Sequence, residues 1–269
     1  MQSARSLAPA VRAHTKVVFM NKIFYIIVFF FISAHLYSQQ ASLRTQASFS
    51  DNRQYCVSVT GYFYEGFVND QRILLSDIKG DTLWQKVVSR RFLILPSVSN
   101  NGDVAITHRE IKIFNKNNEL KGVFTFAKGE SPVDYQEPVH GFSSKGDRYF
   151  IFIHKIPLDK NKLSNVFLVC FDDSARKIWE SNFGDYKPHG ILFYKDKIIV
   201  HDCGFAGSDY LNGCYIYNMD GNVLWQHETD SKNGLDWRVT LNQSNGFLYL
   251  IDKTIETKIM LDSLVLIKK

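Results

Sequence analysis

A polar turn flanked by apolar runs recurs along residues 53–269, and this repeat constrains the fold more than any other feature of the sequence. Each copy reads as the end of one strand, a tight turn and the start of the next strand. The turn positions are Gly80, Asn118, Ala175, Gly221 and, in a weaker fifth copy, Ser263, with spacings of 38, 57, 46 and 42 residues. Glycine and asparagine accept the positive φ of tight hairpins, whereas Ala175 and Ser263 fit it less well and predict longer turns or turns of another type.

A second predicted hairpin precedes each of the later copies, with its turn at Asn101-Gly102, Lys145-Gly146, Lys195-Asp196 or Asn245-Gly246. Its paired strands are expected at Phe92–Ser99 and Asp103–His108, Val139–Ser144 and Arg148–His154, Gly190–Tyr194 and Lys197–Cys203, and Trp237–Asn242 and Phe247–Asp252. The first unit is expected to contain strands at Tyr55–Val59, Tyr62–Phe67, Arg72–Ser76 and Thr82–Val88. Five four-stranded units would then fill residues 53–269, and residues 39–52 would form a linker or a closing strand.

Four-stranded antiparallel units at a spacing of about 40–50 residues are typical of β-propeller blades. After the N-terminal leader, no long segment has the 3.6-residue apolar period of a helix, which disfavours α/β folds. Aromatic residues make up 14% of the chain, a composition that also favours strands. We therefore predict an all-β fold, a β-propeller of about five four-stranded antiparallel blades. The alternatives are a β-sandwich and an open propeller arc.

Three tryptophans mark the same place in three of the units. Trp84, Trp179 and Trp225 each follow their turn position by four residues and are expected to pack one sheet against the next. The copies Gly80–Trp84 and Gly221–Trp225 resemble blades of the quinoprotein (PQQ-dependent dehydrogenase) propeller superfamily, as a degenerate repeat of WD40-like form. The resemblance implies a propeller that serves as a binding or scaffolding module. The cofactor-binding dehydrogenases of this superfamily have an adjacent pair of cysteines. This chain has none, so no quinone cofactor is expected.

Residues 20–38 have the three parts of a secretory signal peptide. Met20-Asn21-Lys22 is a short basic start, Ile23–Ile32 is a run of ten apolar residues, and Ser38 is a small residue at a cleavage point before Gln39. Ten apolar residues are too few to span a bilayer, which needs about 20. We predict a leader over residues 1–38 with Met20 as the true start, export to the periplasm or the cell exterior, and no transmembrane segment in the mature chain. The alternative is an uncleaved N-terminal anchor.

The basic character of the chain comes mostly from this leader. The net charge of +5 includes four basic residues before position 39, so the mature chain keeps 28 basic and 27 acidic residues. A nearly neutral chain gives no support for a nucleic-acid partner, which needs a clustered basic face. An exported chain can keep disulfides, and Cys203 and Cys214 flank a loop between two predicted strands. A disulfide between them and two free thiols are both open at this point.

Five of the six histidines in the mature chain occupy repeat-related positions. They are His108, His154 and His201 at the end of a second strand, where the last unit has Asp252, and His140 and His189 at the start of a first strand. Hairpin midpoints at residues 147 and 195 predict that His140 lies opposite His154 and that His189 lies opposite His201. We interpret these positions, with Trp237 beside them, as one ligand-binding rim. The alternative is a structural hydrogen bond inherited by each repeat.

Histidine pairs of this kind could bind a divalent metal, with His140, His154, His189 and His201 as ligands, and no other cofactor is expected. We predict a binding or scaffold module for a protein or carbohydrate ligand, without defined catalysis. The alternative is a carbohydrate-active hydrolase or a metal-binding redox propeller with its site on the histidine-lined rim. Glu130, Asp134 and Glu137, in one loop, are weaker candidates for paired catalytic carboxylates.

Overall fold

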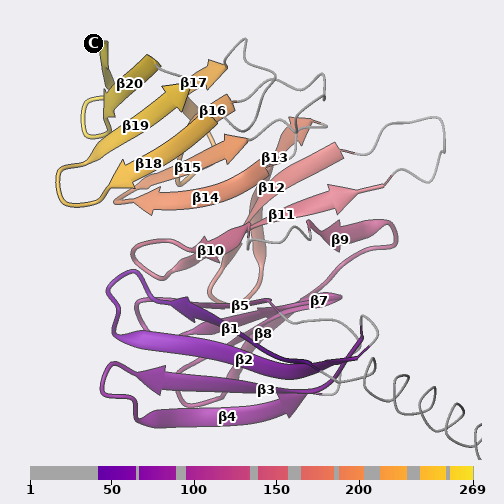
Figure 1. Cartoon of the computed structure of the whole chain (residues 1–269). Coiled ribbons are helices and arrows are strands. Elements are labelled where there is room, and N and C mark those ends of the chain that lie inside the picture. The colour runs from indigo at the N-terminus through magenta and orange to yellow at the C-terminus, as the bar shows by residue number, and fades with distance from the viewer. Residues whose placement is uncertain are drawn as a thin grey trace, which may run out of the picture.

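The computed structural model describes residues 42–64, 67–88, 95–133, 139–156, 165–184, 188–202, 213–228, 237–252 and 255–268. The regular elements in these ranges are β-strands, and they form five antiparallel sheets that follow one another in chain order (Figure 1). These strands and sheets confirm the all-β prediction. Within the same ranges, no helix is long and apolar enough to cross a membrane.

The five sheets are numbered here as blades 1 to 5. Blade 1 consists of β1 (Ser42–Phe49), β2 (Tyr55–Tyr64), β3 (Phe67–Asp77) and β4 (Thr82–Val88). Blade 2 consists of β5 (Leu95–Val98), β6 (Val104–Thr107), β7 (Glu110–Phe114) and β8 (Leu120–Thr125). Blade 3 consists of β10 (His140–Phe142), β11 (Arg148–Lys155), β12 (Asn165–Asp172) and β13 (Lys177–Gly184), and β9 (Glu130–Pro132) also pairs with β11. Blade 4 consists of β14 (Pro188–Tyr194), β15 (Lys197–Asp202), β16 (Gly213–Asn218) and β17 (Val223–Glu228), and blade 5 of β18 (Trp237–Asn242), β19 (Phe247–Asp252), β20 (Ile255–Met260) and β21 (Val265–Lys268).

Blade 1 differs from the prediction in its first two strands. The segments Tyr55–Val59 and Tyr62–Phe67, predicted as separate strands, are not a pair: Tyr55–Tyr64 is the single strand β2. The register shifts between Thr60 and Tyr62, where Gly61 faces two residues of β3, Asp70 and Gln71, so Gly61 lies inside a continuous strand and the bulge is in β3, at the positive φ of Asp70. The missing first strand is β1, which comes from the segment predicted as a linker or closing strand and pairs along its whole length with β2.

The turns between third and fourth strands share one construction. The predicted turn positions Gly80, Asn118, Ala175 and Gly221 all have positive φ, at 86°, 65°, 58° and 85°. In the fifth copy, Leu264 rather than Ser263 takes this conformation, with φ of 55°. The different turn predicted at Ala175 is wrong, because Asp172 Oδ1 accepts hydrogen bonds from Ser174 N and Arg176 N at 2.9 Å each. Equivalent side-chain acceptors, Asp77, Asn115 and Asn218, anchor the other three turns, so the same hydrogen bonds hold this turn with glycine or with another residue at the positive φ.

The three tryptophans are equivalent, as the repeat predicts. Trp84, Trp179 and Trp225 lie opposite a residue of the third strand at the position where the register shifts by one. Trp179 Nε1 donates a 2.8 Å hydrogen bond to the carbonyl of Met219 in the turn of the next blade. The Trp84 ring lies 6.3 Å from that of Phe114, also in the next blade. Each of these indoles therefore joins its own blade to the following one.

Four apolar clusters hold consecutive blades together. They include Ile73 and Phe114 between blades 1 and 2, Ile113 and Ile151 between blades 2 and 3, Phe152 and Val200 between blades 3 and 4, and Ile216 and Leu250 between blades 4 and 5. In the described ranges, no such cluster and no strand pairing joins blade 5 back to blade 1. Figure 1 shows these two blades at opposite ends of the fan, which is the open-arc alternative.

Candidate functional site

Turns between first and second strands lie at one end of the assembly, and side-chain hydrogen bonds link neighbouring turns. Asn52 N donates to Asn100 Oδ1 at 2.8 Å, and Asn100 Nδ2 donates to the carbonyl of Ser144 at 2.6 Å, which connects blades 1, 2 and 3. Gln243 Nε2 donates to the carbonyl of Phe193 at 2.9 Å and connects blade 5 to blade 4. These hydrogen bonds hold the turns of neighbouring blades in fixed positions relative to one another.

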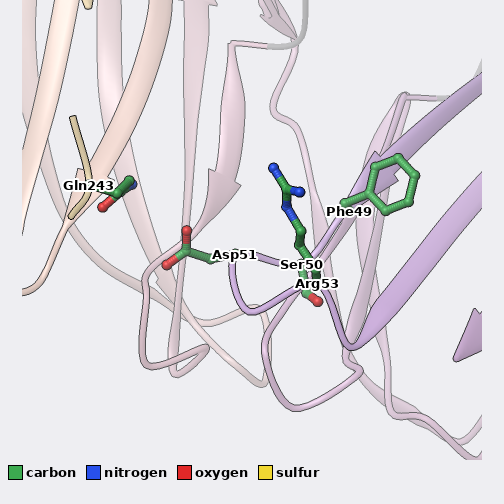
Figure 2. Close-up of a pocket in the computed structure, with 5 residues that line it drawn as sticks. All are labelled: Phe49, Ser50, Asp51, Arg53 and Gln243. Atoms are coloured by element: carbon green, nitrogen blue, oxygen red, sulfur yellow. The ribbon is translucent and has the colours of Figure 1, made fainter. Parts of the chain in front are cut away.

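A cleft of about 820 Å³ opens at this end between the first and last blades. Its described lining is Phe49, Ser50, Asp51 and Arg53 from blade 1 and Gln243 from blade 5 (Figure 2). A second hollow of about 470 Å³ shares Asp51 and Gln243 with it and is also lined by Ser144, Tyr194, Lys195, Ser244, Asn245 and Asp262. We call the two together the turn-end cleft. Its lining comes from blades 1, 3, 4 and 5 and is mostly polar.

An ion pair defines the electrostatics of the second hollow. Lys195 Nζ lies 2.7 Å from Asp262 Oδ1, and the Tyr194 hydroxyl donates to Asp262 Oδ2 at 3.4 Å. The hydrogen bond from Lys195 lowers the pKa of the Asp262 carboxyl, and the same bond raises the pKa of Lys195. Both groups are therefore charged at neutral pH, and Asp262 is poorly suited to act as a general acid.

His140 is buried between blades 2 and 3 instead of lining an open rim. Only 8% of His140 is exposed. Its Nδ1 lies 3.0 Å from the Tyr149 hydroxyl, which lies 2.8 Å from Thr107 Oγ1, so three side chains form a hydrogen-bonded chain across the interface. Within the described part of the chain, His140 Nε2 has no hydrogen-bond partner. Burial lowers the pKa of His140 to about 4, so the ring is neutral at neutral pH.

The predicted opposition of His140 and His154 is wrong. His140 lies opposite Ile151, because the hairpin is centred between Lys145 and Gly146 rather than at residue 147. Residues 151 and 154 have opposite parity, so the two histidines point to opposite faces of blade 3. Ile151 packs toward blade 2, whereas the face that holds Phe152 and His154 packs toward blade 4. These two histidines cannot bind one metal ion together.

The second predicted pair is close to the expected register. Gly190 lies opposite His201 and Pro188 opposite Asp202, so His189 falls at a register shift, and its side chain lies outside the described residues. A Cβ on Gly190 would overlap Nε2 of His201, so glycine leaves the space that this imidazole occupies. His201 shares a face with Ile199 and points toward blade 5. A metal site at His189 and His201 stays a prediction.

The remaining predicted site residues are His108, Trp237 and Asp252. His108 follows β6 and is half-buried, and Trp237 pairs with Asp252 through the backbone, while the side chains of both lie outside the described residues. No group of three or more histidine, cysteine, aspartate or glutamate residues that could hold a metal ion occurs in the part of the chain that the structure describes. His140, His154 and His201 lie on sheet faces directed toward blades 2, 4 and 5, and the ligand-binding rim stays a prediction.

The predicted disulfide involves one residue that is described and one that is not. Cys214 is fully buried and forms no disulfide with another described cysteine, burial raises its pKa, and the register places His201 opposite it. Cys203 lies outside the described residues. The Cys203–Cys214 disulfide therefore stays a prediction.

Comparison with solved structures settles the architecture. The chain matches the Dos1 propeller with a TM-score of 0.50 and 13% identity over 85% of this chain and 58% of that one. It matches the β-propeller domain of the Trilobed protease from Pyrococcus furiosus, described as having an open velcro topology, with a TM-score of 0.51 and 13% identity over 84% and 70% of the two chains. The fold is a β-propeller. The propeller also matches Pyrococcus horikoshii acylaminoacyl peptidase with a TM-score of 0.53 and 10% identity over 85% of this chain and 39% of that one.

These likenesses establish the propeller fold and nothing about its ligand. No protein-family model and no curated protein matches the sequence. The propeller spans 58% and 39% of the lengths of the Dos1 and acylaminoacyl peptidase chains, so their activities are not carried over. The quinoprotein resemblance stays a prediction.

The turn-end cleft was not predicted from the sequence, because it forms only where turns of several blades meet. First strands of the blades surround the central channel of a propeller, so their turns gather at one mouth of the channel. Asn101-Gly102 and Asn245-Gly246 were correctly predicted as such turns. The turn at residues 50–54 was not predicted, because β1 was not assigned and Arg53, with φ of 57°, occupies the position that glycine usually marks. Asp51 and Arg53 therefore gave no recognisable signal.

Proposed function

We propose that the chain is an exported, non-catalytic binding module whose turn-end cleft binds a hydroxyl-rich ligand, most simply an oligosaccharide. The observation that carries the proposal is the cleft itself, an open space of about 820 Å³ that continues into the 470 Å³ hollow and is lined by turns of four blades. Binding sites are typically concave and contain a few fixed polar groups. Loops held by a rigid scaffold are the usual carriers of such groups.

The chemistry of the lining supports a ligand rich in hydroxyl groups. Gln243 and Asn245 offer both amide donors and carbonyl acceptors, and Ser244 offers a hydroxyl, so all three can bond to groups that also donate and accept. Phe49, on the blade 1 side of the cleft and across from Gln243, is 64% exposed and offers an apolar surface for the face of a sugar ring (Figure 2). The lining carries charges of both signs, Asp51 with Arg53 and Lys195 with Asp262, which does not favour a strongly charged ligand.

The described carboxylates give less support to a hydrolase. Asp262 is held in its ionised form by Lys195. Glu130, a candidate from the sequence, accepts a 3.0 Å hydrogen bond from Ala127 N and lies 3.4 Å from Lys155 Nζ, so it stabilises its own turn. Asp134 and Glu137 lie outside the described residues. A retaining or inverting glycosidase needs one carboxyl with a raised pKa, whereas the pKa of Asp262 is lowered.

We expect calorimetric titration to detect binding of at least one of cellohexaose, chitohexaose and maltohexaose at millimolar concentration. The double variant Asp51→Ala/Gln243→Ala should weaken that binding roughly ten-fold, because each lost hydrogen bond contributes about 0.5–1.5 kcal/mol. Asp81→Ala/Gln85→Ala, which removes the same two residue types from exposed positions elsewhere on blade 1, should leave the affinity unchanged. Binding that survives the cleft variant, or no binding of any of the three sugars, would contradict the proposal. Release of shorter sugars would instead indicate a hydrolase.

Export is tested separately. Expression from Met20 in a bacterial host should place the protein outside the cytoplasm, with Gln39 at the N-terminus of the processed chain by mass spectrometry. Replacing Phe29 and Phe30 in the apolar run with lysine should keep the protein in the cytoplasm, because the run is then too polar to enter the membrane. An exported product that retains residues 20–38 would support the anchor, and export of the lysine variant would contradict the signal peptide.

A further inference from the structure

The face of blade 5 that points away from blade 4 has no partner among the described elements. Its residues alternate with those that pack on blade 4, such as Leu248, Leu250 and Ile259. We call it the blade 5 outer face, and it consists of Arg238, Thr240, Asn242, Phe247, Tyr249, Ile251, Glu256, Lys258, Met260 and Val265. None of these residues belongs to the four core clusters, and Val265 is 52% exposed.

The composition of this face is that of a protein interface rather than of a solvated sheet surface. Phe247, Tyr249, Ile251 and Met260 form an apolar centre, with the rings of Phe247 and Tyr249 6.4 Å apart. Polar and charged side chains surround this centre. Aromatic residues, methionine and arginine are the types enriched at protein interfaces, where an apolar centre is bordered by a polar rim.

The exposed face of blade 1, at the other end of the arc, is different. There Thr45 Oγ1 and Thr60 Oγ1 lie within hydrogen-bond distance of each other at 3.1 Å, and Phe49, 64% exposed at the end of β1, shares their face. Ala47 lies opposite Ser58 on the same face. Arg72, from β3, is a charged residue of this face and lies between Thr60 and the exposed Val87 of β4. Because Arg72 has the same charge as Arg238 and Lys258, this face of blade 1 complements the blade 5 outer face less well than an acidic surface would.

The charges of the blade 5 outer face favour an acidic partner. Lys258 Nζ is held 3.7 Å above the centre of the Phe247 ring and 5.5 Å from that of Tyr249, which fixes the ammonium group in place over the apolar centre. Among the described residues, neither Lys258 nor Arg238 forms an ion pair. Glu256 is the acid on this face. We propose that the blade 5 outer face docks an acidic protein surface, whose carboxylates meet Lys258 and Arg238 while apolar groups cover Phe247 and Tyr249.

Fluorescence anisotropy with short labelled peptides tests this proposal. We expect a peptide of alternating glutamate and tyrosine to bind roughly ten-fold more tightly than one of alternating lysine and tyrosine, because complementary charge selects the partner. Lys258→Glu should weaken binding of the acidic peptide roughly ten-fold, and Lys258→Gln should weaken it less. The matched control is Lys116→Glu, on an exposed turn of blade 2, and it should have no effect.

Several outcomes would overturn the proposal. They are equal binding of the two peptides, an unchanged affinity in Lys258→Glu with a native thermal transition, and tighter binding of oligogalacturonate, which would assign the face to an anionic polysaccharide. Concentration-dependent dimers that Lys258→Glu abolishes would assign it to a second copy. The cleft variant Asp51→Ala/Gln243→Ala should leave peptide binding unchanged, so failure here and failure of the proposed sugar binding are distinguishable.

Discussion

The wild-type propeller should lose about 3 kcal/mol of unfolding free energy as the pH falls from 6.5 to 4, and His140→Gln should lose much less. His140 is 8% exposed, and burial lowers its pKa to about 4 in the folded state, against 6.5 in the unfolded chain. Between these values the unfolded chain binds the proton and the folded chain does not. The stability contributed by the neutral ring is therefore complete above pH 6.5, decreases as the pH falls, and is lost at about pH 4.

Urea unfolding across this pH range measures the effect. Glutamine at position 140 can still bond to the Tyr149 hydroxyl, and Thr107 remains beside that hydroxyl, so the variant should fold. His154→Gln is the matched control. It removes a histidine of the same blade on the opposite face and should keep the decline due to His140. A wild-type stability that is flat from pH 6.5 to 4, or an equally steep decline in His140→Gln, would show that the buried imidazole is not responsible.

Gly122→Ala should destabilise the propeller by about 3 kcal/mol, although it adds one methyl group. Gly122 lies in β8 opposite Ile113, at the position that Trp84, Trp179 and Trp225 occupy in the other blades. A Cβ there would overlap the backbone carbonyl of Ser174, in the turn of blade 3. That turn is held against blade 2 by Lys121, whose Nζ lies 2.6 Å from Asp173 Oδ2 and 2.9 Å from Asp103 Oδ2, so it cannot easily move away.

Gly122→Trp tests the same contact with the residue type that three other blades have at this position. It restores the side chain that the other units suggest, yet we expect it to prevent stable folding, because an indole cannot fit where a methyl group already overlaps the backbone. Gly80→Ala is the control: it has φ of 86° but no atom within 4 Å of a new Cβ, so it should cost only about 1 kcal/mol of backbone strain. Thermal unfolding compares the three variants. A Gly122→Ala protein as stable as Gly80→Ala would contradict the packing of blades 2 and 3 described here.

Many strands and turns of the propeller were predictable from the sequence. Strand alternation and turn chemistry are local properties, so β18 and β19 were predicted with their bounds and Gly80, Asn118 and Gly221 were identified as turn positions. The errors came from positions where glycine did not mark a turn, or where a turn formed without glycine. Gly61 lies inside β2, opposite a bulge in β3, whereas Arg53 takes a left-handed turn conformation without glycine.

The candidate site was less predictable than the fold, for a physical reason. In a sheet, a shift of one residue moves a side chain to the opposite face. The hairpin of His140 is centred between Lys145 and Gly146 rather than at residue 147, so this histidine faces blade 2 while His154 faces away from it. The turn-end cleft depends on turns from four blades, and no stretch of sequence contains that arrangement.

By itself, the sequence determined the number of blades, the antiparallel hairpins and the tryptophans that join one blade to the next, because backbone conformation and apolar periodicity act between near neighbours. Only the tertiary structure decided that the interface between blades 5 and 1 lacks an apolar cluster among the described residues, that Gly122 must remain glycine, and that Asp51 and Gln243 line one cleft. Those features depend on which faces of distant strands contact each other. The register of the strands decides which side chains lie on each face, and the register is set by the folded sheets.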